Sequence, residues 1–309
     1  MNTPLVSILI PNFNYATFLP AAIDSALQQD YPALEILIGD DASTDASDEI
    51  CKAYANRDTR IRYHRHPQNL GMVANWNWCL RQARGTYIRL LMADDLIVTP
   101  TAIRQMSEIL NTQPHIAIVT SMRQHIDAKG DPLPQPEPYL DHSGTIPAQH
   151  WIQQHLTRKV PEHLNSIGEP SAVLFRKNLA ARGFDESLQQ FVDLEMWLHL
   201  LTQGDLYYMH EPLCAFRKHP EQQTEHNRRR GIHRIEEMEI YARYSPQPFR
   251  DRHRYRIMRR MQKEQHKMAH HIRQHLHDEL GKMRMTTHAM RYRLNRLQTN
   301  ITRLRPPRA

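Results

Sequence analysis

Two pairs of adjacent aspartates follow short apolar runs within the first hundred residues. Asp40-Asp41 follows the run 34–38, and Asp94-Asp95 follows the run 86–92. Neighbouring carboxylates are costly to hold together unless something binds them. Their oxygens are hard ligands of the kind that Mg²⁺ and Mn²⁺ prefer, and such a cation can hold a diphosphate in turn. No Lys or Arg lies near these acids in the sequence, which favours a cation site.

The turn 11–14 after the first apolar run contains no glycine-rich phosphate loop. The dinucleotide-binding Rossmann fold needs glycines at this point, so the sequence argues against NAD or FAD. Phe13 could stack on a base at the end of a strand, and Asn14 could orient polar groups beside it. The alternative is an ordinary turn with a buried Phe.

Two periodicities alternate over the first 120 residues. Short buried runs predict strands and helical spacing predicts helices between them. The pattern predicts an α/β fold with a mostly parallel, doubly wound sheet and helices on both faces. Ligands of such sheets lie beyond the carboxyl ends of the strands, which is where both aspartate pairs fall. The predicted strands are 5–10, 34–38, 61–63, 86–92 and 116–120, and the predicted helices are 17–29, 45–56, 72–83 and 99–111.

The pattern changes over 128–148, where five prolines predict a long irregular loop. Long loops inside a domain are often functional. Beyond it, the spacing predicts helices over 149–158 and 191–202, and strands over 171–175 and 206–209.

Five motifs, taken in order, resemble the family 2 glycosyltransferases of the GT-A fold over about residues 4–222. They are Pro11-Asn-Phe-Asn14, Asp40-Asp-Ala-Ser-Thr-Asp45, Asn69-Leu-Gly71 with Asn75-Trp-Asn77, Ala83-Arg-Gly-Thr-Tyr-Ile88 and Ala93-Asp94-Asp95. The resemblance implies an inverting enzyme that moves a sugar from a nucleoside-diphosphate sugar, with UDP as the expected nucleotide, to an acceptor hydroxyl. It also implies Mg²⁺ or Mn²⁺ as the cofactor, and surface polysaccharide or glycolipid assembly as the setting.

The resemblance assigns the donor side residue by residue. Asp41 would read the base, Asp94 would contact the ribose or phosphates, and Asp95 would bind the metal. Phe13 stands where the family usually has Tyr, and Trp76 where many members have Arg. The residues expected around the nucleotide sugar are Pro11, Phe13, Asn14, Asp41, Asn69, Asn77 and Asp94.

On the acceptor side, the resemblance makes Asp193 the candidate general base, because an attacking hydroxyl must lose its proton. An Asp near a helix start is also a common cap, and Glu195 is then the substitute base. His219 follows the last predicted strand and could be a metal ligand or phosphate contact. The alternative is an exposed loop histidine. Trp197 is expected in the core.

The charge divides the chain into an acidic body and a basic tail. Residues 1–224 carry 18 Lys and Arg against 25 Asp and Glu, whereas residues 225–309 carry 22 against 8. We therefore expect a glycosyltransferase domain over 1–224 and a basic helical tail over 225–309. Apolar residues at heptad spacing between Leu276 and Leu304 predict a coiled coil. The tail could serve oligomerisation, docking on anionic lipid or, as the third alternative, nucleic-acid binding.

Other features bear on location and on alternative functions. No apolar stretch approaches 18 residues, no basic segment precedes the first apolar run, and the three cysteines are scattered. These features predict a cytoplasmic protein, with contact at the inner face of the membrane as an extension. A catalytically inactive scaffold with a transferase-like body is the main alternative function, and a nucleic-acid-binding protein is another.

Overall fold

The structure is a computed structural model. It describes residues 3–135, 140–157, 167–220 and 232–244, together with Gln222, Thr224 and Asn227. The chain divides into two units. The first comprises Met1–Trp151, His163–Ser187 and Val192–His219, and the second comprises Ile152–Glu162, Leu188–Phe191 and Pro220–Ala309.

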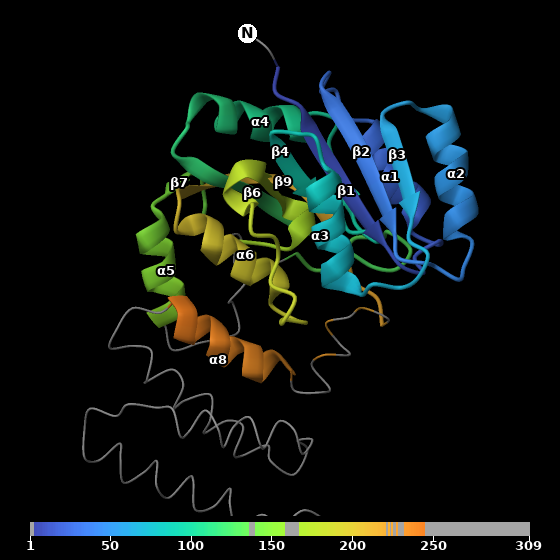
Figure 1. Cartoon of the computed structure of the whole chain (residues 1–309). Coiled ribbons are helices and arrows are strands. Elements are labelled where there is room, and N and C mark those ends of the chain that lie inside the picture. The colour runs from blue at the N-terminus through green and yellow to red at the C-terminus, as the bar shows by residue number, and fades with distance from the viewer. Residues whose placement is uncertain are drawn as a thin grey trace, which may run out of the picture. The chain divides into compact units, whose positions relative to one another are not determined.

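The first unit is built on one sheet with the strand order β3-β2-β1-β4-β8-β6-β9-β5, and β7 pairs with β9 (Figure 1). The sheet uses every strand that the sequence predicts over the first 120 residues. The strands are Val6–Asn12 (β1), Leu34–Asp40 (β2), Ile61–Arg65 (β3), Tyr87–Leu90 (β4), Leu96–Ile97 (β5), Ile116–Ile126 (β6), Gly144–Ile146 (β7), Val173–Arg176 (β8) and Asp205–Arg217 (β9).

The α/β class is confirmed, but the sheet is parallel only in part. Strands β3, β2, β1 and β4 are parallel neighbours. Strand β8 then lies antiparallel to both β4 and β6, while β6 and β9 are parallel. The expectation of a mostly parallel sheet is therefore wrong for the second half. The alternation of strands and helices along the sequence predicts parallel strands joined by crossover helices. It does not show that β8, which comes much later in the sequence, lies between β4 and β6.

The six helices predicted within 1–224 are all present, and each end lies within three residues of its predicted position. Helix α8 lies at the start of the predicted tail. The helices are Leu19–Leu27 (α1), Ser47–Arg57 (α2), Met72–Gln82 (α3), Ala102–Thr112 (α4), Ala148–Thr157 (α5), Val192–Leu201 (α6) and Ile232–Tyr244 (α8).

Side chains alternate between the two faces of β1 and β2, as the strand period requires. Val6, Ile8 and Ile10 belong to a hydrophobic cluster that also contains residues of α1, α2 and α4. On the other face Gly39 approaches α3 so closely that an added Cβ would lie 2.5 Å from the Cys79 Sγ. Figure 1 shows α3 in front of these strands and α1 behind them. Helices cover both faces, so the loops beyond the strand ends are left to form a site.

In the second unit, α8 binds the segment 188–191 through one buried carboxylate. Glu236 accepts the backbone N–H groups of Gln189, Gln190 and Phe191 at 2.6, 2.8 and 2.8 Å. Burial raises the pKa of Glu236, although these three bonds act to lower it. The carboxylate thus fixes three consecutive peptide groups within this unit.

Most of the predicted tail, including the heptad pattern between Leu276 and Leu304, lies outside the described residues. Of the helices that the structure describes, none is long and apolar enough to cross a membrane.

Candidate active site

Asp40 and Asp41 are neighbours at the end of β2, but their carboxylates have different partners. Asp40 is fully buried and accepts the Asn12 side-chain amide at 2.7 Å, together with the N–H and hydroxyl of Ser43. The guanidinium of Arg65, at the end of β3, lies 3.5 Å from the same carboxylate. Asp40 therefore anchors the loop after β2. Although no Lys or Arg lies near Asp40 in the sequence, the adjacent strand thus supplies a cation in the structure.

Asp41 binds the backbone at the start of α3. Its two carboxylate oxygens accept the N–H groups of Leu70 at 2.6 Å and Gly71 at 2.9 Å. The side-chain amide of Asn69 donates to the Asp41 carbonyl at 3.2 Å. The structure thus brings Asp41 and Asn69 together. Each carboxylate oxygen has a second lone pair, so Asp41 can still accept a bond from a ligand N–H.

Phe13 lies in the turn directly after β1, and 43% of its surface is exposed. The alternative of a buried Phe in this turn is therefore wrong. Leu70 and Met72, which flank Gly71, are the other large hydrophobic residues that the structure describes as exposed. Exposed aromatic and apolar surface of this kind is available to stack on a ligand.

The turn after β1 is tied to the loop after β2. Asn14 adopts the left-handed conformation at φ +60°, and its side-chain oxygen accepts the Thr44 N–H at 2.7 Å. Ala42 is also left-handed, which costs an alanine about 1–2 kcal/mol. Strain of this kind concentrates at functional loops. Pro11 lies one step back, buried in β1 opposite Gly39 of β2.

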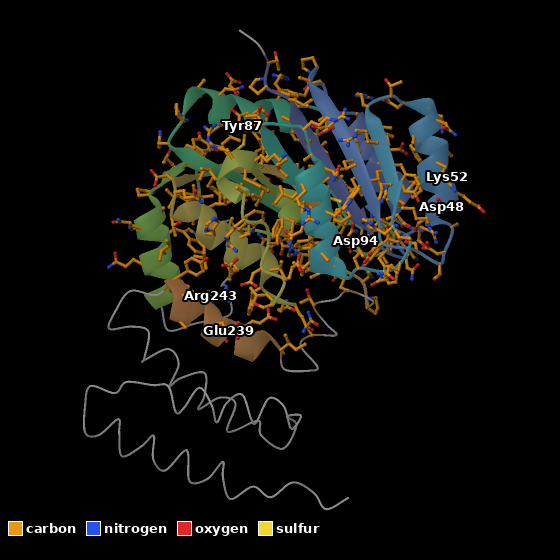
Figure 2. The ribbon with its side chains drawn as sticks, viewed as in Figure 1. Asp48, Lys52, Tyr87, Asp94, Glu239 and Arg243 are labelled. Carbon is orange, nitrogen blue, oxygen red and sulfur yellow. The ribbon has the colours of Figure 1, made fainter. Side chains whose placement is uncertain are left out.

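The second aspartate pair follows β4, and Figure 2 shows Asp94 at the opposite end of this strand from Tyr87. The first pair lies at the end of β2 and the second follows β4, and β1 lies between these two strands. Nε2 of His219 lies 3.0 Å from Oδ2 of Asp94. The His219 side chain is only 3% exposed, so the alternative of an exposed loop histidine is wrong.

Asp95 is buried and receives hydrogen bonds from two distant parts of the chain. The Ser171 hydroxyl donates to Oδ2 at 2.6 Å, and the Arg217 N–H donates to Oδ1 at 2.9 Å. Burial raises the pKa of Asp95 well above its usual range, and the neighbouring Asp94 raises it further. The bonds from Ser171 and Arg217 act in the opposite direction. Sequence reasoning missed Ser171 and Arg217 as partners of this carboxylate.

The side chain of Arg217 joins the loops around Asp94. Its Nε donates to the Asp94 carbonyl at 2.7 Å, and Nη1 donates to the carbonyls of Asp127 and Ala128 at 3.1 and 3.2 Å. Its guanidinium lies 5.0 Å from the ring centroid of Phe18, which also packs against His219 at 5.0 Å. Arg217, at the end of β9, therefore fixes the loop that contains Asp94 to the loop that contains Asp127 and Ala128.

The side chain of Asn77 binds the turn that contains Phe184 and Glu186. Its amide exchanges hydrogen bonds with the Phe184 backbone at 3.0 and 2.7 Å and donates to Glu186 at 3.0 Å. Any contribution of Asn77 to donor binding would have to act through this turn or replace these bonds. Trp76, also on α3, is nearly buried and packs edge-on against Phe184 at 5.4 Å.

Asp193 lies in the first turn of α6 and is half-buried. One of its oxygens accepts the N–H of Leu194 at 2.8 Å. Glu195, the substitute base, is 2% exposed and pairs with Arg182 at 2.6 Å, which gives it a structural partner. Trp197 is fully buried, as expected, and donates to the Gly168 carbonyl at 3.1 Å.

The residues after β4 fit a divalent cation whose ligands come partly from the protein and partly from a bound substrate. Within the described part of the chain, no three His, Cys, Asp or Glu side chains form a metal cluster by themselves. Mg²⁺ characteristically takes one or two carboxylates and completes its shell with water and phosphate oxygens. Two adjacent carboxylates, one of them buried with a raised pKa, match that pattern, because a cation would stabilise their charged forms.

Sequence comparison finds relatives that are described as glycosyltransferases. An uncharacterized glycosyltransferase of Rickettsia typhi is 31% identical over 229 residues, which cover 72% of this chain and 66% of the relative. An uncharacterized glycosyltransferase of Haemophilus influenzae is 34% identical over 133 residues, which cover 43% of this chain and 52% of the relative. The chain thus spans slightly less than two thirds of the first relative and about half of the second.

Solved structures share the fold at low identity. TarS residues 1–349 of S. aureus, determined in complex with UDP-GlcNAc, matches with a TM-score of 0.62 and 14% identity, covering 81% of this chain and 69% of TarS 1–349. The mannosyltransferase PcManGT of Pyrobaculum calidifontis, in complex with GDP-Man and Mn²⁺, matches with a TM-score of 0.55 and 17% identity, covering 79% and 64%. The model of glycosyl transferase family 2 matches residues 7–184. This confirms the prediction from the five motifs, and the chain belongs to glycosyl transferase family 2.

Proposed function

We propose that the protein is an inverting glycosyltransferase that moves a sugar from a nucleoside-diphosphate sugar to an acceptor hydroxyl with the help of Mg²⁺ or Mn²⁺. The arrangement of Asp41, Asp94 and Asp95 is the observation that carries this proposal. Asp41 follows β2 and the other two follow β4, the strands on either side of β1 in the parallel part of the sheet. Each of the three is held by hydrogen bonds from other loops. That edge is where open α/β sheets bind nucleotides.

The loops after β1 and β2 would hold the nucleoside. The exposed ring of Phe13 would stack on the base, and the Asp41 carboxylate would accept the base N–H. Asn14 and Asn69 fix the two loops and lie beside these groups. Pro11 would act from within β1 by shaping the turn, and Asn77 through the turn that contains Phe184.

The loop after β4 would hold the diphosphate. Asp95 and His219 are the proposed metal-binding side chains, and Asp94 would contact the ribose or phosphates while His219 holds its carboxylate. When bound, the cation would neutralise the charge that develops on the leaving diphosphate. The buried positions of Asp95 and His219 would keep their orientation fixed for that contact.

Asp193 is the proposed general base. The acceptor oxygen forms a bond to the anomeric carbon while the bond from that carbon to the diphosphate breaks, and the acceptor proton passes to the Asp193 carboxylate. Its place in the first turn of α6 favours the charged form, because helix N-termini stabilise negative charge. Attack from the face opposite the leaving group gives inversion.

The UDP-GlcNAc and GDP-Man complexes of the two solved neighbours support a nucleotide-sugar donor and make UDP- and GDP-sugars the first candidates. The Mn²⁺ in the second complex supports a divalent cation. We place the acceptor among the glycans or lipid-linked glycans of surface polysaccharide or glycolipid assembly. The basic composition and heptad spacing of 225–309 support a role in oligomerisation, with docking on an anionic membrane as the second possibility.

A panel of nucleotide sugars with Mn²⁺ tests the proposal. The expected result is release of a nucleoside diphosphate from at least one donor, and its loss in Asp95→Asn. Asp48→Asn on α2 is the matched control, since Asp48 pairs with Lys52 on the helix surface (Figure 2). Failure of the wild-type protein to bind or turn over any donor would favour the inactive-scaffold alternative.

A further inference from the structure

Ser171 occupies a position that the proposed reaction has not used. It lies in the short 3₁₀ helix Pro170–Ala172, before β8, and is 1% exposed. Its hydroxyl accepts the N–H of Met92 at 3.0 Å and donates to the carboxylate of Asp95 at 2.6 Å. The Met92 bond fixes a lone pair of the hydroxyl, because an N–H can only donate. The hydroxyl proton is therefore directed at Asp95.

A fully buried arginine supports the backbone that carries Ser171. Arg89 of β4 donates from Nη2 to the carbonyls of Ser171 at 2.6 Å and Leu213 at 3.2 Å, and from Nη1 to the Met106 Sδ at 3.1 Å. Burial lowers its pKa to about 10, although Cys214 and Asp95 act to raise it. Within the described residues, its Nε has no hydrogen-bond partner.

A buried cation bonded to carbonyls is costly, so its location calls for a reason. Arg89 joins the two segments that supply both hydrogen-bond donors to Asp95. Ser171 lies in one of them, and the other is β9, which contains Leu213 and ends at Arg217. The guanidinium therefore holds these two segments at a fixed spacing around the carboxylate.

We propose that Ser171 is a positioning residue for Asp95, with Arg89 holding the Ser171 backbone, so that the Asp95 carboxylate is pre-oriented for a divalent cation. The inference rests on the proposed function, in which Asp95 binds the metal. Partners of metal-binding carboxylates typically affect metal affinity by about 10- to 100-fold when they are removed. Ser171 donates to one oxygen and leaves the carboxylate other lone pairs for a cation.

The test is the affinity for Mn²⁺ in the presence of UDP or GDP, measured by the electron paramagnetic resonance of free Mn²⁺. Ser171→Ala should weaken Mn²⁺ binding about 10-fold or more. Ser171→Thr keeps the hydroxyl and should bind Mn²⁺ close to the wild-type level. If the Ala variant does not fold, Ser171→Cys has nearly the same size as Ser but is a poor donor, and it should show the same loss.

Ser25→Ala is the matched control. The buried Ser25 hydroxyl also accepts a backbone N–H, that of Ile97 at 3.1 Å, and donates to an oxygen, the Ala22 carbonyl at 2.8 Å. Its loss should lower stability in a similar way and leave Mn²⁺ affinity unchanged.

Steady-state kinetics give a second readout. In Ser171→Ala the Mn²⁺ concentration for half-maximal turnover should rise about 10-fold, and kcat at saturating Mn²⁺ should recover most of its wild-type value. A purely structural role would instead lower kcat at every Mn²⁺ concentration. Equal Mn²⁺ affinity in Ser171→Ala and the wild type would overturn the inference and leave the proposed function standing. A wild-type protein that binds neither nucleotide nor Mn²⁺ would overturn both.

Discussion

His219, after the last strand of the sheet, contacts Asp94, after the fourth, with 3.0 Å between Nε2 and Oδ2. The two residues are 125 positions apart in the sequence. The imidazole also packs against the rings of Phe18 at 5.0 Å and Tyr15 at 5.9 Å. The contact thus orients the first aspartate of the pair after β4 from a segment that the sequence places far away.

Removing the imidazole of His219 should weaken donor binding. We expect His219→Ala to raise the donor KM on the order of tenfold, because a hydrogen bond to a charged group contributes about 1.5–3 kcal/mol. Initial-rate kinetics at saturating Mn²⁺ measure this change. His199→Ala on α6 is a control with the same side chain in a different place. An unchanged KM and Mn²⁺ requirement in His219→Ala would contradict a role for this residue in the site.

The two acids of α6 should behave differently when neutralised. Asp193→Asn should lower kcat by about 10²–10⁴-fold, the usual contribution of a general base, and leave the donor KM nearly unchanged. Glu195→Gln should keep turnover and lower the free energy of unfolding by about 1 kcal/mol, since it weakens the bond with Arg182. A large loss of kcat in Glu195→Gln, with little loss in Asp193→Asn, would instead identify Glu195 as the general base.

Chelation should abolish turnover without unfolding the protein. The described residues form no cluster of three metal-binding side chains, so the cation is expected to bind mainly together with the diphosphate. EDTA should therefore stop nucleoside-diphosphate release and leave the thermal unfolding midpoint of the free protein unchanged. Added Mn²⁺ should restore the rate. Full turnover in EDTA would show a metal-independent enzyme.

His125 on β6 should make stability depend on pH. Burial, together with the smaller effects of the charges on Lys218 and Arg123, lowers its pKa to about 4. The unfolded chain binds this proton near the ordinary value of 6.5, so it holds more protons than the folded chain between the two values. The contribution of His125 to the free energy of unfolding should therefore be fully present above pH 6.5 and should be lost as the pH falls towards 4.

Urea unfolding at about pH 7.5, 5.5 and 4.5 measures this effect. His125→Gln should remove that part of the pH dependence. A variant that loses stability with acid as steeply as the wild type would show that other groups carry the whole effect.

The positions of the residues proposed for donor binding were largely predictable because these residues lie in short loops after strands. Asp41 and Asn69 were predicted, and the structure brings them together through the backbone at the start of α3. Phe13 was predicted in the turn after β1 and is exposed there. Strand and helix periodicity places such loops at one edge, so local sequence is enough to find them.

The partners that hold the aspartates were not predictable from local sequence. Ser171 and Arg217 reach Asp95 across 76 and 122 positions, and Arg65 reaches Asp40 from the end of another strand. The Ser171 and Arg217 contacts depend on β8 entering antiparallel between β4 and β6, with β9 beside β6. That order is decided by tertiary packing, which periodicity does not encode.

Calorimetric titration of UDP and GDP, with and without Mn²⁺, tests the central claim most directly. We predict that at least one diphosphate binds much more tightly in the presence of Mn²⁺, and that Asp95→Asn removes this difference while the control Asp48→Asn keeps it. Binding that is the same with and without Mn²⁺, or absent for both diphosphates in the wild-type protein, would contradict a metal and nucleotide site at the carboxyl edge of β2, β1 and β4.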